Sequence, residues 1–184
     1  MAFKDRGYQR FTVQESTNII LPRLINVTPV IVADDNADND VAFNWTKVTG
    51  ASLTKGHPTK LVSAAILDPN VALAGIDLFF CRGSGIDGTA PTTAQNLQDG
   101  AAGSAVVDIT AAEALAIVVC GNVSMPVDEG SLILASTVTK GNINLIMSPA
   151  QNSRDLYVAG VWRSEPADIT GGVAYIEMYL GFEG

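Results

Sequence analysis

Two stretches near the end of the chain decide the fold class: Asp155–Trp162 (DLYVAGVW) and Gly172–Phe182 (GVAYIEMYLGF). Both are rich in aromatic side chains and alternate apolar with other residues, which is the pattern of a β-strand with a buried face. The turn-like segment RSEPADITG joins them. The sequence therefore predicts a terminal β-hairpin that is buried on one face.

Upstream, short apolar runs of the same kind are separated by segments rich in Gly, Asn, Asp and Pro. We expect strands at Val27–Ala33, Val41–Val48, Lys60–Leu67, Gly75–Arg82 and Val119–Met125. Two more strands are expected on either side of Lys140-Gly141-Asn142, which is a hairpin-type break. Alternation within Val41–Val48 predicts that Val41, Phe43, Trp45 and Lys47 share one face.

One short helix is expected at Thr110–Val118, where Thr110 and Glu113 have the spacing of a capping box. Nine or ten short strands with a single helix favour an all-β protein. We predict an antiparallel β-sandwich of jelly-roll type over residues 19–184, preceded by an N-terminal arm at residues 1–18. The long Gly/Thr/Ala-rich connection Gly83–Gly103 is typical of a functional or interface loop.

The charge of the chain is low and unevenly distributed. Charged residues make up 16% of the sequence, below the usual quarter, so either part of the surface is covered by another protein or the surface is polar and uncharged. Residues 1–24 hold four basic and two acidic side chains, whereas the other 160 hold 7 basic and 17 acidic ones. An acidic body disfavours nucleic acid as a partner. The basic start is either a docking arm for an acidic partner or a frayed terminus.

The beginning of the chain, Met1–Arg10, has no apolar stretch of the signal-peptide type, and no run approaches the length of a membrane span. We therefore expect a protein that is made and kept soluble in a cytoplasm and has no membrane partner. In that reducing compartment, Cys81 and Cys120 are expected to be buried free thiols.

Side chains suited to catalysis are few. The glycines Gly83, Gly85 and Gly88 have GxGxxG spacing, but no helical pattern follows them, so a loop is favoured over a dinucleotide site. The acidic run Asp34–Asp40 lacks the EF-hand pattern and is interpreted as a solvated turn, with an adventitious cation as the alternative. The single histidine, His57, lies in a loop. We predict no enzyme activity, no cofactor and no metal site.

The second half of the chain has a distinctive succession of segments: LVSAAILD, GIDLFFCRG, TAAEALAIVVCGNVSM and the stretch from LILAS to the closing MYLGF. This succession resembles small virion proteins encoded beside the major capsid protein of tailed bacteriophages. The resemblance runs from about Lys60 to the end. It implies an auxiliary capsid protein, also called a decoration or cement protein, with a β-sandwich body and no catalytic residues.

By this resemblance we expect a structural protein that binds the major capsid protein lattice on the outer surface of the virion, and binds itself as a homo-oligomer, with a trimer favoured. It would be made in the host bacterial cytoplasm. The expected partner-binding residues lie in the arm: Lys4, Arg6, Tyr8, Arg10 and Phe11. The loop around Gly83–Gly103 is a second expected contact.

Two alternatives remain. Within virion proteins, the chain is instead a head-fibre, tail or baseplate component. From another class, it is a carbohydrate-binding module in which Trp45 or Trp162 stacks on sugar rings, although aromatic residues at alternate strand positions usually fill a core.

Overall fold

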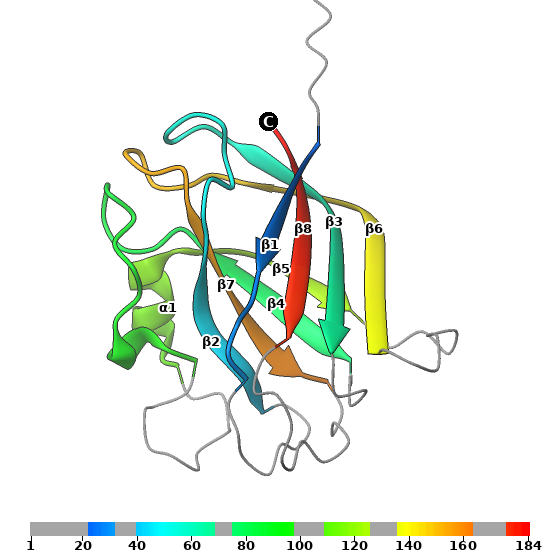
Figure 1. Ribbon diagram of the computed structural model, residues 1–184. Helices are drawn as coiled ribbons and strands as arrows, with labels where there is room; N and C mark the ends of the chain where they lie inside the picture. The colour runs from blue at the N-terminus through cyan, green and yellow to red at the C-terminus, as the bar shows by residue number, and fades with distance from the viewer. Residues whose placement is uncertain (1–21, 32–39, 69–74, 98–108, 126–135, 164–175) are drawn as a thin grey trace, which may run out of the picture.

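The computed structural model describes residues 22–31, 40–68, 75–97, 109–125, 136–163 and 176–184, and these are mostly β (Figure 1). They form eight strands, against nine or ten expected over the whole chain. The strands are β1 (Arg23–Val27), β2 (Val41–Val48), β3 (Thr59–Asp68), β4 (Ile76–Cys81), β5 (Val119–Met125), β6 (Ser136–Met147), β7 (Leu156–Trp162) and β8 (Glu177–Glu183). A 3-10 turn, η1 (Thr93–Gln95), and one α-helix, α1 (Ala111–Ile117), lie between β4 and β5.

The strands form two antiparallel four-stranded sheets, which confirms the all-β antiparallel prediction. One sheet has the order β1-β8-β3-β6 and the other the order β2-β7-β4-β5. Four of the pairings are nested in the sequence: β1 with β8, β2 with β7, β3 with β6 and β4 with β5. Two more pairings, β8 with β3 and β7 with β4, complete the sheets.

Both sheets contribute to one buried apolar cluster. Phe182 and Leu180 of β8 come from the first sheet, and Phe43, Phe80 and Trp162 come from the second. All five side chains are almost completely inaccessible to solvent. Burial of large apolar side chains is the main stabilising contribution to a fold of this size, so the two sheets stabilise each other.

The predicted terminal hairpin is wrong. The strands themselves exist, but β7 pairs with β2 and β4, whereas β8 pairs with β1 and β3 in the other sheet. Every residue of β7 is buried, so this strand is covered on both faces rather than one. An alternating pattern identifies a strand with an apolar face, but it does not specify the neighbour with which that strand pairs.

The hairpin break at Lys140-Gly141-Asn142 is also wrong, since β6 continues through it. The pairs Leu61–Leu145 and Ser63–Gly141 leave three residues of β6 opposite one residue of β3, which is a bulge. Asn142 and Asn144 take left-handed backbone conformations there, with φ of 55°. Asn tolerates this conformation, and a turn and a bulge use the same residue types.

Two further strand predictions need correction. Of the strand expected at Val27–Ala33, residues 28–31 continue no strand and residues 32 and 33 lie outside the described residues. The strand found here is β1, Arg23–Val27, which stops before Pro29, a residue with no N–H for a ladder. The bounds of β2 agree with the prediction, but its register is shifted twice. Phe43 therefore packs into the cluster shared by both sheets, while Val41 and Trp45 belong to a second cluster.

The predicted helix is confirmed. Thr110 is the N-cap of α1, and its side chain accepts a hydrogen bond from the Glu113 backbone N–H. The Glu113 carboxylate accepts a hydrogen bond from the Thr110 N–H in return, at 2.9 Å. Val118 ends the helix in a left-handed conformation. Within the described part of the chain, α1 is the only α-helix, and no helix there is long and apolar enough to cross a membrane.

Strand directions place three described connections at one end of the molecule. These are residues 49–58 after β2, residues 82–92 after β4 and residues 148–155 before β7. The first residue of β1 and the C-terminus lie at the same end, which is the upper end in Figure 1. We call these three connections the loop platform.

Candidate functional site

The loop platform is built around its middle loop, residues 148–155, which receives hydrogen bonds from one neighbouring loop and donates them to the other. On one side, Ser52 N–H donates to Arg154 O and Gly56 N–H donates to Ser153 O, both at 2.9 Å. On the other side, Asn152 N–H donates to Ile86 O at 2.8 Å. The middle loop therefore cross-links the other two, and the platform is a braced surface.

Glycine permits the close approach of these loops. Gly56 has a φ of +68°, and a Cβ on it would lie 2.8 Å from Gln151 O. On the other side Gly88 has a φ of +64°, and its Cβ would lie 3.0 Å from Ser153 Cβ. Only glycine combines this backbone conformation with this proximity.

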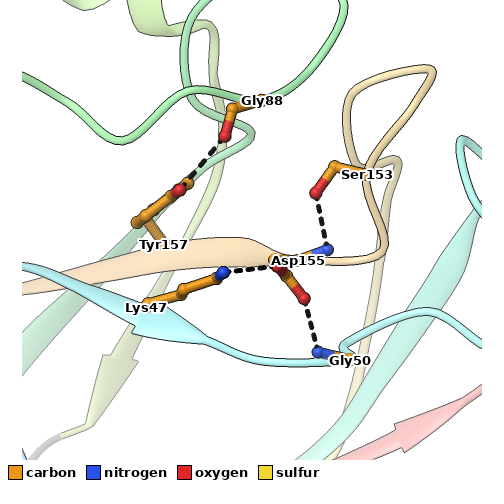
Figure 2. Close-up of polar contacts among 6 residues, drawn as sticks. All are labelled: Lys47, Gly50, Gly88, Ser153, Asp155 and Tyr157. Carbon is orange, nitrogen blue, oxygen red and sulfur yellow. Dashed lines mark hydrogen bonds and ion pairs between the residues drawn. The ribbon is translucent and has the colours of Figure 1, made fainter.

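Asp155 joins the platform to β2, as Figure 2 shows. Its carboxylate lies 2.7 Å from Lys47 Nζ and accepts a hydrogen bond from the Gly50 N–H at 2.8 Å. Its own N–H donates to Ser153 Oγ at 3.0 Å. Partial burial raises the pKa of Asp155, but the hydrogen bonds from Lys47 and Gly50 outweigh that effect and hold the pKa below its ordinary value.

The 82–92 loop is fixed to β7 by Tyr157, whose hydroxyl donates to Gly88 O at 3.1 Å (Figure 2). Ser84 and Thr89 form a two-residue ladder across the loop, with hydrogen bonds of 2.8 and 2.9 Å. The glycines of the GSGIDG sequence, Gly83, Gly85 and Gly88, all have positive φ in this turn. They serve a tight turn, and the element that follows is the three-residue η1.

Arg23 anchors the start of β1 on the platform. Its guanidinium donates to Gly50 O at 2.6 Å and to Ala51 O at 2.8 Å. Arg23 also pairs with Phe182 in the sheet, close to the C-terminus. The first described segment therefore begins at the platform.

The second candidate is a cavity of about 430 Å³ on the face of the β2-β7-β4-β5 sheet that α1 covers. Its wall is mainly apolar and includes Trp45, Phe79, Leu97, Ile109, Ala114 and Val161. Trp45 is held by a hydrogen bond from its Nε1–H to Gln95 O at 2.8 Å. The carboxylate in the wall, Asp77, accepts a hydrogen bond from Ser124 Oγ at 2.6 Å. The cavity therefore suits an apolar group.

The structure places His57, Cys81 and Cys120, the side chains best suited to acid–base or nucleophilic chemistry, on three different elements. His57 is exposed on the 49–58 loop. Cys81 is buried and Cys120 half-buried, and both are free thiols. Burial raises the pKa of Cys81 to about 12 and that of Cys120 to about 11, so both are protonated at neutral pH. Among the described residues, no three His, Cys, Asp or Glu side chains are grouped so as to hold a metal ion.

Several predicted residues lie outside the described residues. These are the arm residues Lys4, Arg6, Tyr8, Arg10 and Phe11, the acidic residues Asp34, Asp35 and Asp38, and the part of the long connection from 98 to 103. Of the two tryptophans proposed for sugar stacking, Trp162 is completely buried and Trp45 is partly buried in the cavity wall. Sequence reasoning did not identify the 148–155 loop or Asp155, whose partners lie about a hundred residues away.

No protein-family model and no curated protein matches this chain.

Proposed function

We propose that this protein is a structural virion component that attaches to the outer surface of a tailed-phage capsid, binds the major capsid protein lattice and stabilises it. It acts through shape and contact area and not as an enzyme. The resemblance of residues from about Lys60 onward to phage auxiliary capsid proteins motivates this proposal, and the nested strand pairing described above is the structural observation that carries it.

The nested pairing supports a jelly-roll sandwich. A long antiparallel ribbon with pairs β1–β8, β2–β7, β3–β6 and β4–β5, once rolled up, yields two sheets with the orders β1-β8-β3-β6 and β2-β7-β4-β5. Jelly rolls are common in viral capsid proteins, but they also occur in lectins and in cupins. The fold therefore narrows the classes of protein to which the chain could belong, and its surface distinguishes among them.

The braced loops support a role in attachment. A protein that holds a lattice together needs a stiff body with a preorganised contact surface, because little conformational entropy is then lost on binding. The cross-linked platform has this property, and β1, which follows the proposed arm over residues 1–18, begins beside it at Arg23. Many copies, favoured here as trimers, would convert weak single contacts into strong attachment.

The direct experiment uses phage heads assembled without this protein. Purified protein is added, the heads are sedimented, and bound protein is quantified and located by electron microscopy. We expect saturable binding at regular lattice positions and heads that withstand higher temperature before releasing DNA. Protein that stays in solution, or that is found only on tails or baseplates, would contradict the proposal and favour the head-fibre, tail or baseplate alternative.

The carbohydrate-binding alternative retains one candidate residue, Trp45, since Trp162 is inaccessible. The cavity beside Trp45 offers a single carboxylate, which is already engaged with Ser124, whereas a sugar needs several free polar partners. We expect no binding on a glycan array. Binding that Trp45→Ala abolishes in a folded protein would favour this alternative instead.

A further inference from the structure

We infer that the loop platform is the face through which this protein meets its partner, and that the partner presents acidic side chains around a shallow apolar recess. This inference rests on the proposed structural role and specifies which of the protein's faces performs it. It comes from three independent features of the described residues: exposed apolar tips, segregated charge and the position of Arg23 at the start of β1.

The first feature is apolar. Leu53 is 57% exposed at the tip of the 49–58 loop, and Ile86 is 62% exposed at the tip of the 82–92 loop. The two tips flank the middle loop, because the Ser52 N–H donates a hydrogen bond to Arg154 O and the Asn152 N–H donates one to Ile86 O. Two other exposed apolar residues, Leu24 and Ile146, lie in strand ends that lead into the platform. Exposed apolar side chains on braced backbone are suited to burial against a partner.

The second feature is charge. Eight basic residues lie in the described part of the chain, and six of them are on the platform or in strand ends that lead into it: Arg23, Lys47, Lys55, Lys60, Arg82 and Arg154. The acidic residues in the same region are Asp87, Asp155 and Glu183. The side chains at this end therefore sum to a net charge of +3, in a chain whose side chains sum to −8. A positive face on an acidic protein attracts a negative surface and orients the protein toward it.

The third feature is the position of Arg23, the first residue of β1. Arg23 is bonded to Gly50 and Ala51, so the 22 residues that precede it join the body at the platform. By sequence, those residues hold three basic and two acidic side chains, a net charge of +1. A partner that contacts the start of β1 therefore lies on the same side as the Leu53 and Ile86 tips.

Photo-crosslinking on phage heads assembled without the protein tests the inference directly. A photo-reactive phenylalanine derivative is placed at position 53 or 86, and at position 30 or 115 as a control. Val30 and Leu115 are as exposed as the tips, at 71% and 76%, but Val30 follows the far end of β1 and Leu115 lies on α1, so neither belongs to the three platform loops. We expect covalent products with the major capsid protein from positions 53 and 86 only. Products from position 30 or 115, with none from 53 and 86, would overturn the inference.

Binding measurements give a second test. We expect the double variant Leu53→Ser/Ile86→Ser to bind heads at least about tenfold more weakly, because two apolar side chains lose their burial. The control variant Val30→Ser/Leu115→Ser, with the same chemical change, should bind like the original protein. Lys55→Glu should weaken binding at 50 mM salt and have a smaller effect at 500 mM, where charge is screened. Circular dichroism checks that each variant is folded.

The outcomes separate the two proposals. An original protein that does not bind heads contradicts the proposed function, and the inference fails with it. An original protein that binds heads, while the Val30/Leu115 variant is the weaker binder, contradicts only the inference and assigns attachment to another face. Equal binding by all variants at both salt concentrations would also overturn the inference.

Discussion

At the scale of single residues, the platform depends on glycine and on one carboxylate. Gly56 and Gly50 lie in the same loop with nearly equal φ, +68° and +69°, but they differ in their surroundings. A Cβ on Gly56 would lie 2.8 Å from Gln151 O, whereas a Cβ on Gly50 would meet nothing within 4 Å. Substituting each of these two glycines therefore separates the energetic cost of the left-handed backbone conformation from the cost of crowding between the loops.

We predict that Gly50→Ala lowers the free energy of unfolding by about 1–2 kcal/mol, the cost of a left-handed conformation for a residue with a Cβ. Gly56→Ala should cost about 1–3 kcal/mol more, because the added methyl group pushes the 148–155 loop away. Urea unfolding monitored by fluorescence measures both. Equal losses for the two variants would mean that the loops yield without cost and that the platform is not tightly braced.

The Asp155 carboxylate makes stability depend on pH in a defined direction. Its pKa is lower in the folded protein than in the unfolded chain, so its contribution is complete above the unfolded pKa, about 4, and is lost as pH falls through the folded pKa. We predict that Asp155→Asn is less stable than the original protein at pH 7 and that the difference shrinks below about pH 4. Urea unfolding at pH 7, 4 and 2.5 checks this. A difference that does not change with pH would contradict it.

At the scale of elements, β6 shows that an asparagine in a strand-like sequence can indicate either a hairpin turn or a bulge. Asn142 and Asn144 have φ of 55°, and the Asn144 side chain donates to Asn142 O at 3.3 Å. The same residues serve a hairpin turn or a bulge, and only the partner strand distinguishes them. Here β3 pairs with both halves of β6, so the chain continues instead of reversing.

We predict that Asn144→Gly keeps or slightly raises the free energy of unfolding, since glycine adopts left-handed backbone without strain. Asn144→Val should lower it by about 1–2 kcal/mol, because a β-branched residue is strained there. Thr139→Val, in the ordinary extended part of the same strand, is the matched control and should be nearly neutral. Thermal unfolding measures all three, and an Asn144→Val variant as stable as the control would contradict the bulge.

At the scale of the whole molecule, the shared core makes the two sheets one cooperative unit. Phe182 lies in the β1-β8-β3-β6 sheet, whereas both tryptophans of the chain, Trp45 and Trp162, lie in the other sheet. Phe182 and Trp162 belong to the same buried cluster. Tryptophan fluorescence therefore reports on one sheet when the other is perturbed.

We predict that Phe182→Ala lowers the free energy of unfolding by about 3–5 kcal/mol, the usual cost of removing a buried phenylalanine. Tryptophan fluorescence and far-UV circular dichroism should shift to the same new midpoint. Lys140→Ala is an informative comparison, because it removes a half-buried side chain and its hydrogen bond from Lys140 Nζ to Ser124 O, but no core side chain, and should cost about 1 kcal/mol. Separate midpoints for the two signals would show that the sheets unfold independently.

Local patterns in the sequence were enough to predict the all-β class, the location of most strands and the one described α-helix. These follow from local properties: the apolar runs of β3 and β7, and the capping spacing of Thr110 and Glu113. Three features became known only from the folded chain: β7 and β8 lie in different sheets, β6 is continuous, and residues 49–58, 82–92 and 148–155 form one platform. Strand pairing and loop contacts join residues up to about 160 positions apart, and the pattern of neighbouring residues does not specify partners at that distance.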